Sequence, residues 1–143
     1  MNYSLDTLLY GMQFRRLLEK EMQPIETEYG LRKIDVQILL YLKHAGEHNT
    51  SKDIMQLNMF TRGHISQSLS RLQKMEYVRM EQDLNDRRCT HNYLTENASD
   101  VIRKIEKISG TIKKIVLDGV TEKERRVLVT VAKKMNSNIE KVL

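Results

Sequence analysis

The spacing of apolar residues along the first third of the chain predicts amphipathic helices. Leucine, methionine and isoleucine recur at steps of three and four over about 4–22, which is the pattern of a helix with one buried face. Pro24 is expected to disturb the end of this helix, because proline lacks the amide hydrogen. A second helix is predicted over 34–44, with Gly46 as its stop.

Two capping patterns predict the next helices. Thr50 and Asp53 stand three residues apart, so a hydroxyl and a carboxylate can satisfy free amides at the start of a short third helix. Thr61 is expected to cap a fourth helix that runs to about Met75. The inward face of this fourth helix would consist of Ile65, Leu69 and Leu72.

After the fourth helix the hydrophobic period changes from helical to alternating. Residues 77–82 and 89–94 alternate as two strands, and 83–88 form a polar turn between them. This pattern predicts a β-hairpin with a charged tip.

The last third of the chain predicts two long helices. Thr95 is expected to cap the first, whose apolar positions repeat as in a coiled-coil seam: Val101, Ile105, Ile108, Ile112 and Ile115. A capping box over 121–124 opens the second, whose apolar stripe is Leu128, Val131, Met135, Ile139 and Val142. One small domain has little left to cover this stripe, so we expect a homodimer through the terminal helices. An intramolecular helical hairpin is the alternative.

Together these elements predict a mainly α fold with a small β-hairpin wing. We expect an N-terminal dimerisation helix in 1–30, a winged helix-turn-helix domain in 31–95 and C-terminal dimerisation helices in 96–143.

Composition narrows the class of protein. The 143 residues are 40% hydrophobic and 30% charged, which is an ordinary globular balance. A single cysteine excludes an internal disulfide and favours a cytoplasmic location. No apolar run reaches the roughly 18 residues of a membrane span, and no signal peptide is expected. The sequence holds no nucleophile elbow and no glycine-rich phosphate loop, so neither an enzyme nor a cofactor is expected.

The net charge of +5 is distributed unevenly. Residues 1–30 are net −2, whereas 61–80 are net +3 and 101–115 are net +4. We interpret 101–115 as a solvated helix face. The segment 61–80 points to a function, because its charges surround the predicted fourth helix and hairpin.

With its apolar residues inward, the fourth helix would present a short, polar and basic face. A helix of this kind fits the DNA major groove, where its first turns reach base edges. Gln67 can pair with adenine, Arg62 can pair with guanine, and Gly63 permits a close approach. The predicted DNA-contacting residues of this helix are Thr61, Arg62, Gly63, His64, Ser66, Gln67, Ser70, Arg71 and Lys74.

The hairpin tip adds Arg87 and Arg88 beside Asp86. A carboxylate can hold a guanidinium group in one orientation, and narrow minor grooves attract an oriented arginine. We therefore expect the recognition helix 61–75 in the major groove and the wing 83–89 in the minor groove of one duplex.

The segment 83–88, followed by Leu94-Thr95-Glu96, resembles the wing signature of the MarR family of winged helix-turn-helix bacterial transcriptional regulators. The spacing of 61–72 is similar to that of the family's recognition helix. The resemblance implies a homodimer that binds a pseudo-palindromic operator in double-stranded DNA. It also implies that Arg88 is the wing-tip arginine and that the first, fifth and sixth helices form the dimer interface.

The sequence departs from the family pattern at three positions. Arg32 stands where threonine is common, and Ala98 stands where glycine is common. Glu76 stands where glycine usually ends the recognition helix, so this turn is expected to need another geometry.

The resemblance further implies a repressor that a small phenolic or otherwise amphipathic effector releases from DNA. By position, Met12, Arg16 and Tyr41 are candidates to line its pocket; methionine as core filler is the alternative. Oxidation of Cys89, which follows Arg88, would disturb DNA contact; an incidental cysteine is the alternative.

His44 and His48 have a spacing that can bind zinc, but two histidines near a helix end also complement the helix dipole, and we expect no metal. The alternative to DNA binding is a winged-helix dimer that docks another protein through its basic face.

Overall fold

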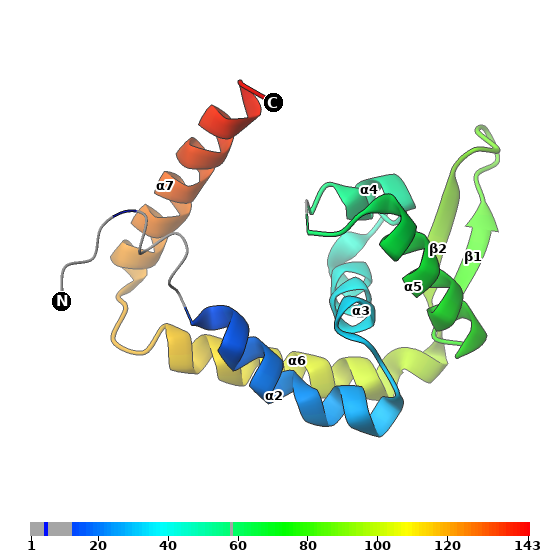
Figure 1. Ribbon diagram of the computed structural model, residues 1–143, viewed down its shortest axis with the longest axis horizontal. Helices are drawn as coiled ribbons and strands as arrows, with labels where there is room; N and C mark the ends of the chain where they lie inside the picture. Colours follow the sequence, from blue (N-terminus) through cyan, green and yellow to red (C-terminus); the bar gives the residue numbers. More distant parts are fainter. Residues whose placement is uncertain (1–4, 6–12, 58) are drawn as a thin grey trace. The chain divides into compact units, whose positions relative to one another are not determined.

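The computed structural model describes residues 5, 13–57 and 59–143, and it confirms a mainly helical fold with a two-stranded wing (Figure 1). The chain divides into two compact units, Met1–Ile112 and Lys113–Leu143. The boundary falls within α6 (Ser99–Val116), and the second unit contains the end of α6 and α7 (Glu122–Glu140). In the described part of the chain, each helix is too short or too polar to cross a membrane.

The first unit contains the predicted helix-turn-helix and hairpin. Its elements before α6 are α2 (Phe14–Tyr29), α3 (Lys33–Ala45), α4 (Ser51–Met55), α5 (Arg62–Lys74), β1 (Val78–Gln82), β2 (Thr90–Leu94) and a short 3₁₀ turn (Glu96–Ala98). The strands pair antiparallel, with Val78 opposite Leu94 and Gln82 opposite Thr90.

The core of this unit is built from the apolar faces of these elements. The predicted inward residues of α5, Ile65, Leu69 and Leu72, are all buried, as are Ile38 and Leu39 of α3. Each buried side chain of this size stabilises the fold by about 1.5 to 3 kcal/mol. The core therefore fixes which side of α5 remains in solvent.

The first described helix extends beyond the predicted end. Of the residues before 13 only Leu5 is described, so Met12 lies outside the described residues. Pro24 does not end α2; it lies inside the helix, which continues to Tyr29 and ends at Gly30, where φ is +66°. Pro24 is exposed, while Met22 and Ile25 on either side of it are buried. Packing of these neighbours outweighs the local cost of proline, which is about 3 kcal/mol in a helix interior.

Side-chain contacts join α2 to the first part of α6, and Figure 1 shows these helices side by side. The hydroxyl of Tyr29 donates to Asp100 at 2.8 Å, and Nζ of Lys104 donates to Glu28 at 2.9 Å. The bond to Glu28 raises the pKa of Lys104. These polar contacts flank the buried Ile102 and Ile105 of α6.

Three of the four predicted threonine caps are present. Thr50 and Thr121 form capping boxes with Asp53 and Glu124, and the Thr61 hydroxyl accepts from the His64 amide. Thr95 does not cap a long helix as predicted, because its hydroxyl donates to the Glu76 carbonyl instead. The 3₁₀ turn follows Thr95, and α6 begins only at Ser99.

The turn after α5 takes the geometry that glycine would take, contrary to the prediction. Glu76 has φ of +62°, the only positive φ of a non-glycine residue in the described ranges. The Tyr77 amide donates to the Leu72 carbonyl at 2.9 Å and the Glu76 amide to the Gln73 carbonyl at 3.0 Å. This pair of bonds is a Schellman motif. The chain thus keeps the motif and bears the cost of a side chain in the left-handed region.

Replacing Glu76 with glycine is expected to stabilise the protein by about 0.5 to 1 kcal/mol, because glycine adopts this φ without steric cost. Urea unfolding monitored by circular dichroism measures the change. Gly30→Ala is the matched control, since φ at Gly30 is also positive and that change should destabilise the protein. A loss of stability in Glu76→Gly would contradict the assignment of strain to this turn.

The second unit contains α7, which has no buried residue. Its predicted apolar stripe is exposed by 38% to 82%, at Leu128, Val131, Met135, Ile139 and Val142. Ile115, the last position of the predicted seam on α6, is 52% exposed. The apolar stripe of α7 is therefore unpartnered within its own unit.

Candidate nucleic-acid interface

One face of α5 carries most of the predicted DNA-contacting side chains in solvent. The buried Ile65, Leu69 and Leu72 fix the opposite face toward the core. The exposed members of the predicted set are Thr61, Arg62, Gly63, His64, Ser66, Gln67, Ser70 and Lys74. The exposed Arg62 and Lys74 thus lie at the two ends of α5, with the hydrogen-bonding side chains of Ser66, Gln67 and Ser70 between them.

Arg71 is an exception, because its guanidinium group is held by the core. Nη2 and Nε of Arg71 donate to the Asp35 carboxylate at 2.8 and 3.4 Å, and the Arg71 side chain is only 27% exposed. The Ser68 hydroxyl donates to the same carboxylate at 2.5 Å, and the Arg32 amide donates at 2.9 Å. Arg71 is therefore only partly exposed and its guanidinium group is paired with Asp35, while contact of Arg71 with DNA stays a prediction.

Asp35 and Ser68 are polar residues of the core that the sequence did not identify. Asp35 is 1% exposed and Ser68 is fully buried. A signal was present, since an aspartate on the apolar face of a predicted helix requires a buried partner. The partner lies on another helix, so local spacing did not reveal it. The cluster of Asp35, Ser68 and Arg71 joins α3 to α5 and fixes how α5 sits on the core.

The wing tip is built around two aspartates. Oδ1 of Asp83 accepts from the amides of Asn85 and Asp86 at 2.7 and 2.9 Å. Oδ1 of Asp86 accepts from the Arg88 amide at 3.0 Å and from Nε of Arg88 at 3.3 Å. The Arg88 side chain is 92% exposed. The guanidinium group is therefore oriented at its base and free at its tip.

Hydrogen bonding keeps both wing carboxylates ionised. His91 and the amides of Asn85 and Asp86 lower the pKa of Asp83 to about 2. The backbone and side chain of Arg88 lower the pKa of Asp86. Both carboxylates thus stay charged at ordinary pH and continue to accept the bonds that shape the turn.

His91 connects the wing to the start of α4, a role that the sequence did not show. Nε2 of His91 lies 2.7 Å from Oδ2 of Asp83, and Nδ1 lies 2.6 Å from Oδ1 of Asn49. The amide of Asn92 donates to the Asn49 carbonyl at 3.1 Å, and Asn49 is buried. This contact joins the hairpin to the segment that begins α4 and so fixes the position of the wing on the helix-turn-helix.

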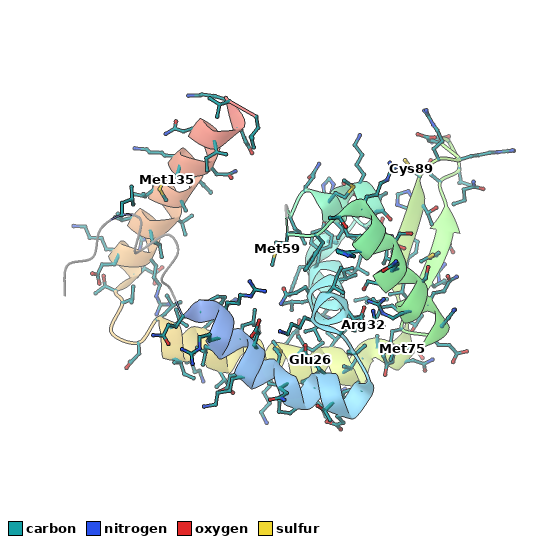
Figure 2. All side chains as sticks on the ribbon, in the orientation of Figure 1. Glu26, Arg32, Met59, Met75, Cys89 and Met135 are labelled. Atoms are coloured by element: carbon teal, nitrogen blue, oxygen red, sulfur yellow. The ribbon has the colours of Figure 1, made fainter. Side chains whose placement is uncertain are left out.

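The environment of Cys89 disfavours a reactive thiol. Its Sγ lies 3.6 Å from Oδ2 of Asp86, which accepts the S–H. Burial and the carboxylates of Asp86 and Asp83 raise the pKa of the Cys89 thiol. Because the thiolate is the reactive form, this geometry supports the interpretation of an incidental cysteine. Figure 2 shows Cys89 at the hairpin.

The two histidines considered as zinc ligands, His44 and His48, have other contacts in the structure. Nε2 of His44, in the last turn of α3, lies 3.4 Å from Oε1 of Glu106. His48 contributes its backbone carbonyl as acceptor for the Tyr41 hydroxyl at 2.8 Å. Within 13–57 and 59–143, no three side chains of metal-binding type gather at one place.

A cavity of about 480 Å³ opens in the first unit between α2, α3 and the residues that precede α5. Glu26 and Met59 of its wall are labelled in Figure 2. The lining residues are Phe14, Arg15, Leu18, Glu19, Met22, Glu26, Lys33, Val36, Gln37, Met59 and Phe60.

The residues expected to line an effector pocket do not line this cavity. Arg16 lies on another face of α2 and donates to Gln13 at 3.3 Å, while its neighbour Arg15 reaches the wall. The Tyr41 hydroxyl is engaged by the His48 carbonyl. Met12 lies outside the described residues. Arg16 and Tyr41 lie on α2 and α3, which also supply the cavity wall, but they do not line it, because successive side chains along a helix point in directions about 100° apart.

Comparisons with known proteins agree with this architecture. Residues 31–98 match the family described as winged helix DNA-binding domain. Among proteins of curated function, none matches this sequence. Solved structures of the same fold include MarR and other regulators of the MarR family.

Three solved structures are similar over nearly the whole chain. The transcriptional regulator PA3341 is 25% identical, covers 96% of this chain and 99% of its own, and has a TM-score of 0.83. MepR of S. aureus, solved as a DNA complex, is 17% identical with a TM-score of 0.75, over 96% and 99% of the two chains. An organohalide-sensing regulator, solved with bound 2,4-dichlorophenol, is 21% identical with a TM-score of 0.68, over 96% and 82%.

The exposed face of α5, the oriented wing arginine and these comparisons lead to one conclusion. Residues 31–98 form a winged helix DNA-binding domain, and nearly the whole chain has the fold of MarR-family transcriptional regulators.

Proposed function

We propose that this protein is a transcriptional regulator that binds a specific sequence in double-stranded DNA, with α5 in the major groove and the wing in the minor groove. The observation that carries the proposal is that Arg62, Gln67 and Lys74 lie exposed on one helix while Arg88 lies exposed and oriented on the wing of the same unit. The contact through His91 and Asn49 holds these elements together. One duplex can then meet both at once.

Within this proposal, the Gln67 side chain recognises the base sequence of the operator. Replacing it with alanine should lower discrimination between operator and random DNA more than it lowers binding to random DNA, because an amide pairs with a base edge. Operator sequences selected from a random pool supply the specific ligand, and anisotropy titrations at fixed salt compare the two DNAs. Lys74→Ala is the matched control and should weaken both about equally. An equal loss on both DNAs in Gln67→Ala would place Gln67 on the backbone.

We also propose a homodimer through the terminal helices. The unpartnered stripe of α7 supports it, because exposed apolar surface of this length is stabilised by a second copy. Two copies would present two α5 helices to the halves of a pseudo-palindromic operator.

The double variant Val131→Glu, Met135→Glu is expected to convert the dimer to monomer, because association would bury four uncompensated charges. Light scattering after size exclusion measures the mass, which should be about twice 16.9 kDa for the unmodified protein. Ser137→Glu on the opposite side of α7 is the matched control and should remain dimeric. A monomeric unmodified protein at micromolar concentration would contradict the proposal.

The third part of the proposal is repression that a small effector relieves by releasing the DNA. The open cavity beside α3 supports it, since α3 carries Asp35 and Asp35 holds α5. A molecule in the cavity that shifts α3 would shift the recognition helix with it. Release of bound operator in a screen of amphipathic molecules tests this step. Absence of DNA binding even at low salt, with a stoichiometric protein partner instead, would overturn the whole proposal.

A further inference from the structure

The wall of the cavity between α2 and α3 is mainly apolar, with two aromatic rings. Phe14 is 47% exposed, and Phe60 and Met59 also line the cavity. Leu18, Met22 and Val36 add aliphatic surface. A volume of about 480 Å³ falls within the range of small-molecule sites, which is about 300 to 1,000 Å³.

The cations of this wall already have an anionic partner. Oε1 of Glu19 lies 3.2 Å from Nε of Arg15 and 3.0 Å from Nζ of Lys33. The Arg15 and Lys33 side chains are 88% and 64% exposed, so their charges extend toward solvent. The hydrogen bond from Lys33, and to a smaller extent that from Arg15, lowers the pKa of Glu19. An incoming anion would have to displace Glu19 from one of these pairs.

Glu26 is different, because its carboxylate makes no ion pair or side-chain hydrogen bond with any residue in 13–57 and 59–143. It lies half-buried on the same wall, two turns from Leu18. Burial raises the pKa of Glu26, with Lys33 opposing the shift and Glu19 reinforcing it. A partly desolvated carboxylate without a partner gains from a cation placed beside it.

We propose that this cavity binds an amphipathic organic cation, with Glu26 as its counter-ion and the rings of Phe14 and Phe60 against its apolar and cationic parts. The inference rests on the proposed effector control and gives the effector a chemical class. Aromatic faces attract cations, so the rings and the carboxylate favour the same charge. A phenolate or carboxylate in the same place would lie beside Glu26 and compete with Glu19.

The test uses two probes of nearly equal shape and opposite charge, tetraphenylphosphonium and tetraphenylborate. Calorimetric titration of the full chain without DNA should show the cation binding at least about ten-fold more tightly than the anion. Glu26→Gln keeps the side-chain shape and should weaken the cation about ten-fold or more, because it removes a charge-assisted contact. Phe14→Ala, at the exposed rim, should weaken binding of the cation without unfolding the chain.

Glu21→Gln is the matched control, since Glu21 is on the same helix but away from the cavity wall, and it should bind the cation as the unmodified protein does. Equal or tighter binding of the anion, or unchanged binding of the cation in Glu26→Gln, would overturn the inference. Operator titrations with and without the cation separate the two proposals. Cation binding that depends on Glu26 but leaves operator affinity unchanged would support the site and overturn effector control.

Discussion

Replacing Asp35 with alanine is expected to destabilise the first unit by about 3 kcal/mol or more. The change leaves the buried Ser68 hydroxyl without its acceptor and Arg71 without its counter-ion, and removing one partner of a buried ion pair costs about 3 to 5 kcal/mol. We expect the lower end of this range, because Arg71 can extend part of its guanidinium group into solvent. Urea unfolding at matched protein concentration measures the loss.

Asp118→Ala is the control for removing one carboxylate, because Asp118 is exposed in the turn after α6. It should change stability by no more than about 0.5 kcal/mol. Arg71→Ala should also destabilise the fold, and the double variant with Asp35→Ala should cost less than the sum of the two single changes. Additive effects, or a loss below about 1 kcal/mol in Asp35→Ala, would mean that the pair does not hold α5 to α3.

The same cluster changes how a loss of DNA binding in an Arg71 variant is interpreted. If Arg71 contacted DNA directly, Arg71→Ala would lower affinity without lowering the free energy of unfolding. Because Arg71 forms an ion pair with Asp35, we expect Arg71→Ala to lower the free energy of unfolding. Measurement of both quantities on one variant distinguishes the two roles.

The second large effect is expected at the wing. Arg88→Ala should lower operator affinity about ten- to hundred-fold, or about 1 to 3 kcal/mol, while leaving the dimer intact. The side chain is 92% exposed, so its removal disturbs no core contact. Anisotropy titration with labelled operator at one fixed salt concentration measures the loss, since affinity for DNA depends steeply on salt.

Arg103→Ala is the matched control, because it removes one exposed positive charge from α6 and not from the wing. Asp86→Ala should give a smaller loss than Arg88→Ala, since it keeps the cation but releases the bonds that orient it. Affinity equal to that of the unmodified protein in Arg88→Ala would remove the wing from the proposed interface.

Local signals in the sequence predicted most of the fold. The capping residues Thr50, Thr61 and Thr121 act within one helical turn, so their partners are readable three residues away. The hairpin is local for the same reason, since its strands are joined by a short turn. The predictions at Pro24 and Glu76 were wrong. Each residue is locally unfavourable in its observed conformation, but the contacts of its neighbours outweigh that cost.

The sequence by itself determined which elements form and which face of α5 is polar, because periodicity and capping depend on neighbours along the chain. Only the tertiary structure decided which polar residues of α5 remain free. Asp35 accepts a hydrogen bond from Arg71, 36 residues away in the sequence, and Asn49 contacts His91, 42 residues away. The cavity likewise depends on which sides of α2 and α3 face each other. Such pairings require the packed core, since spacing along the chain carries no record of which helix lies opposite.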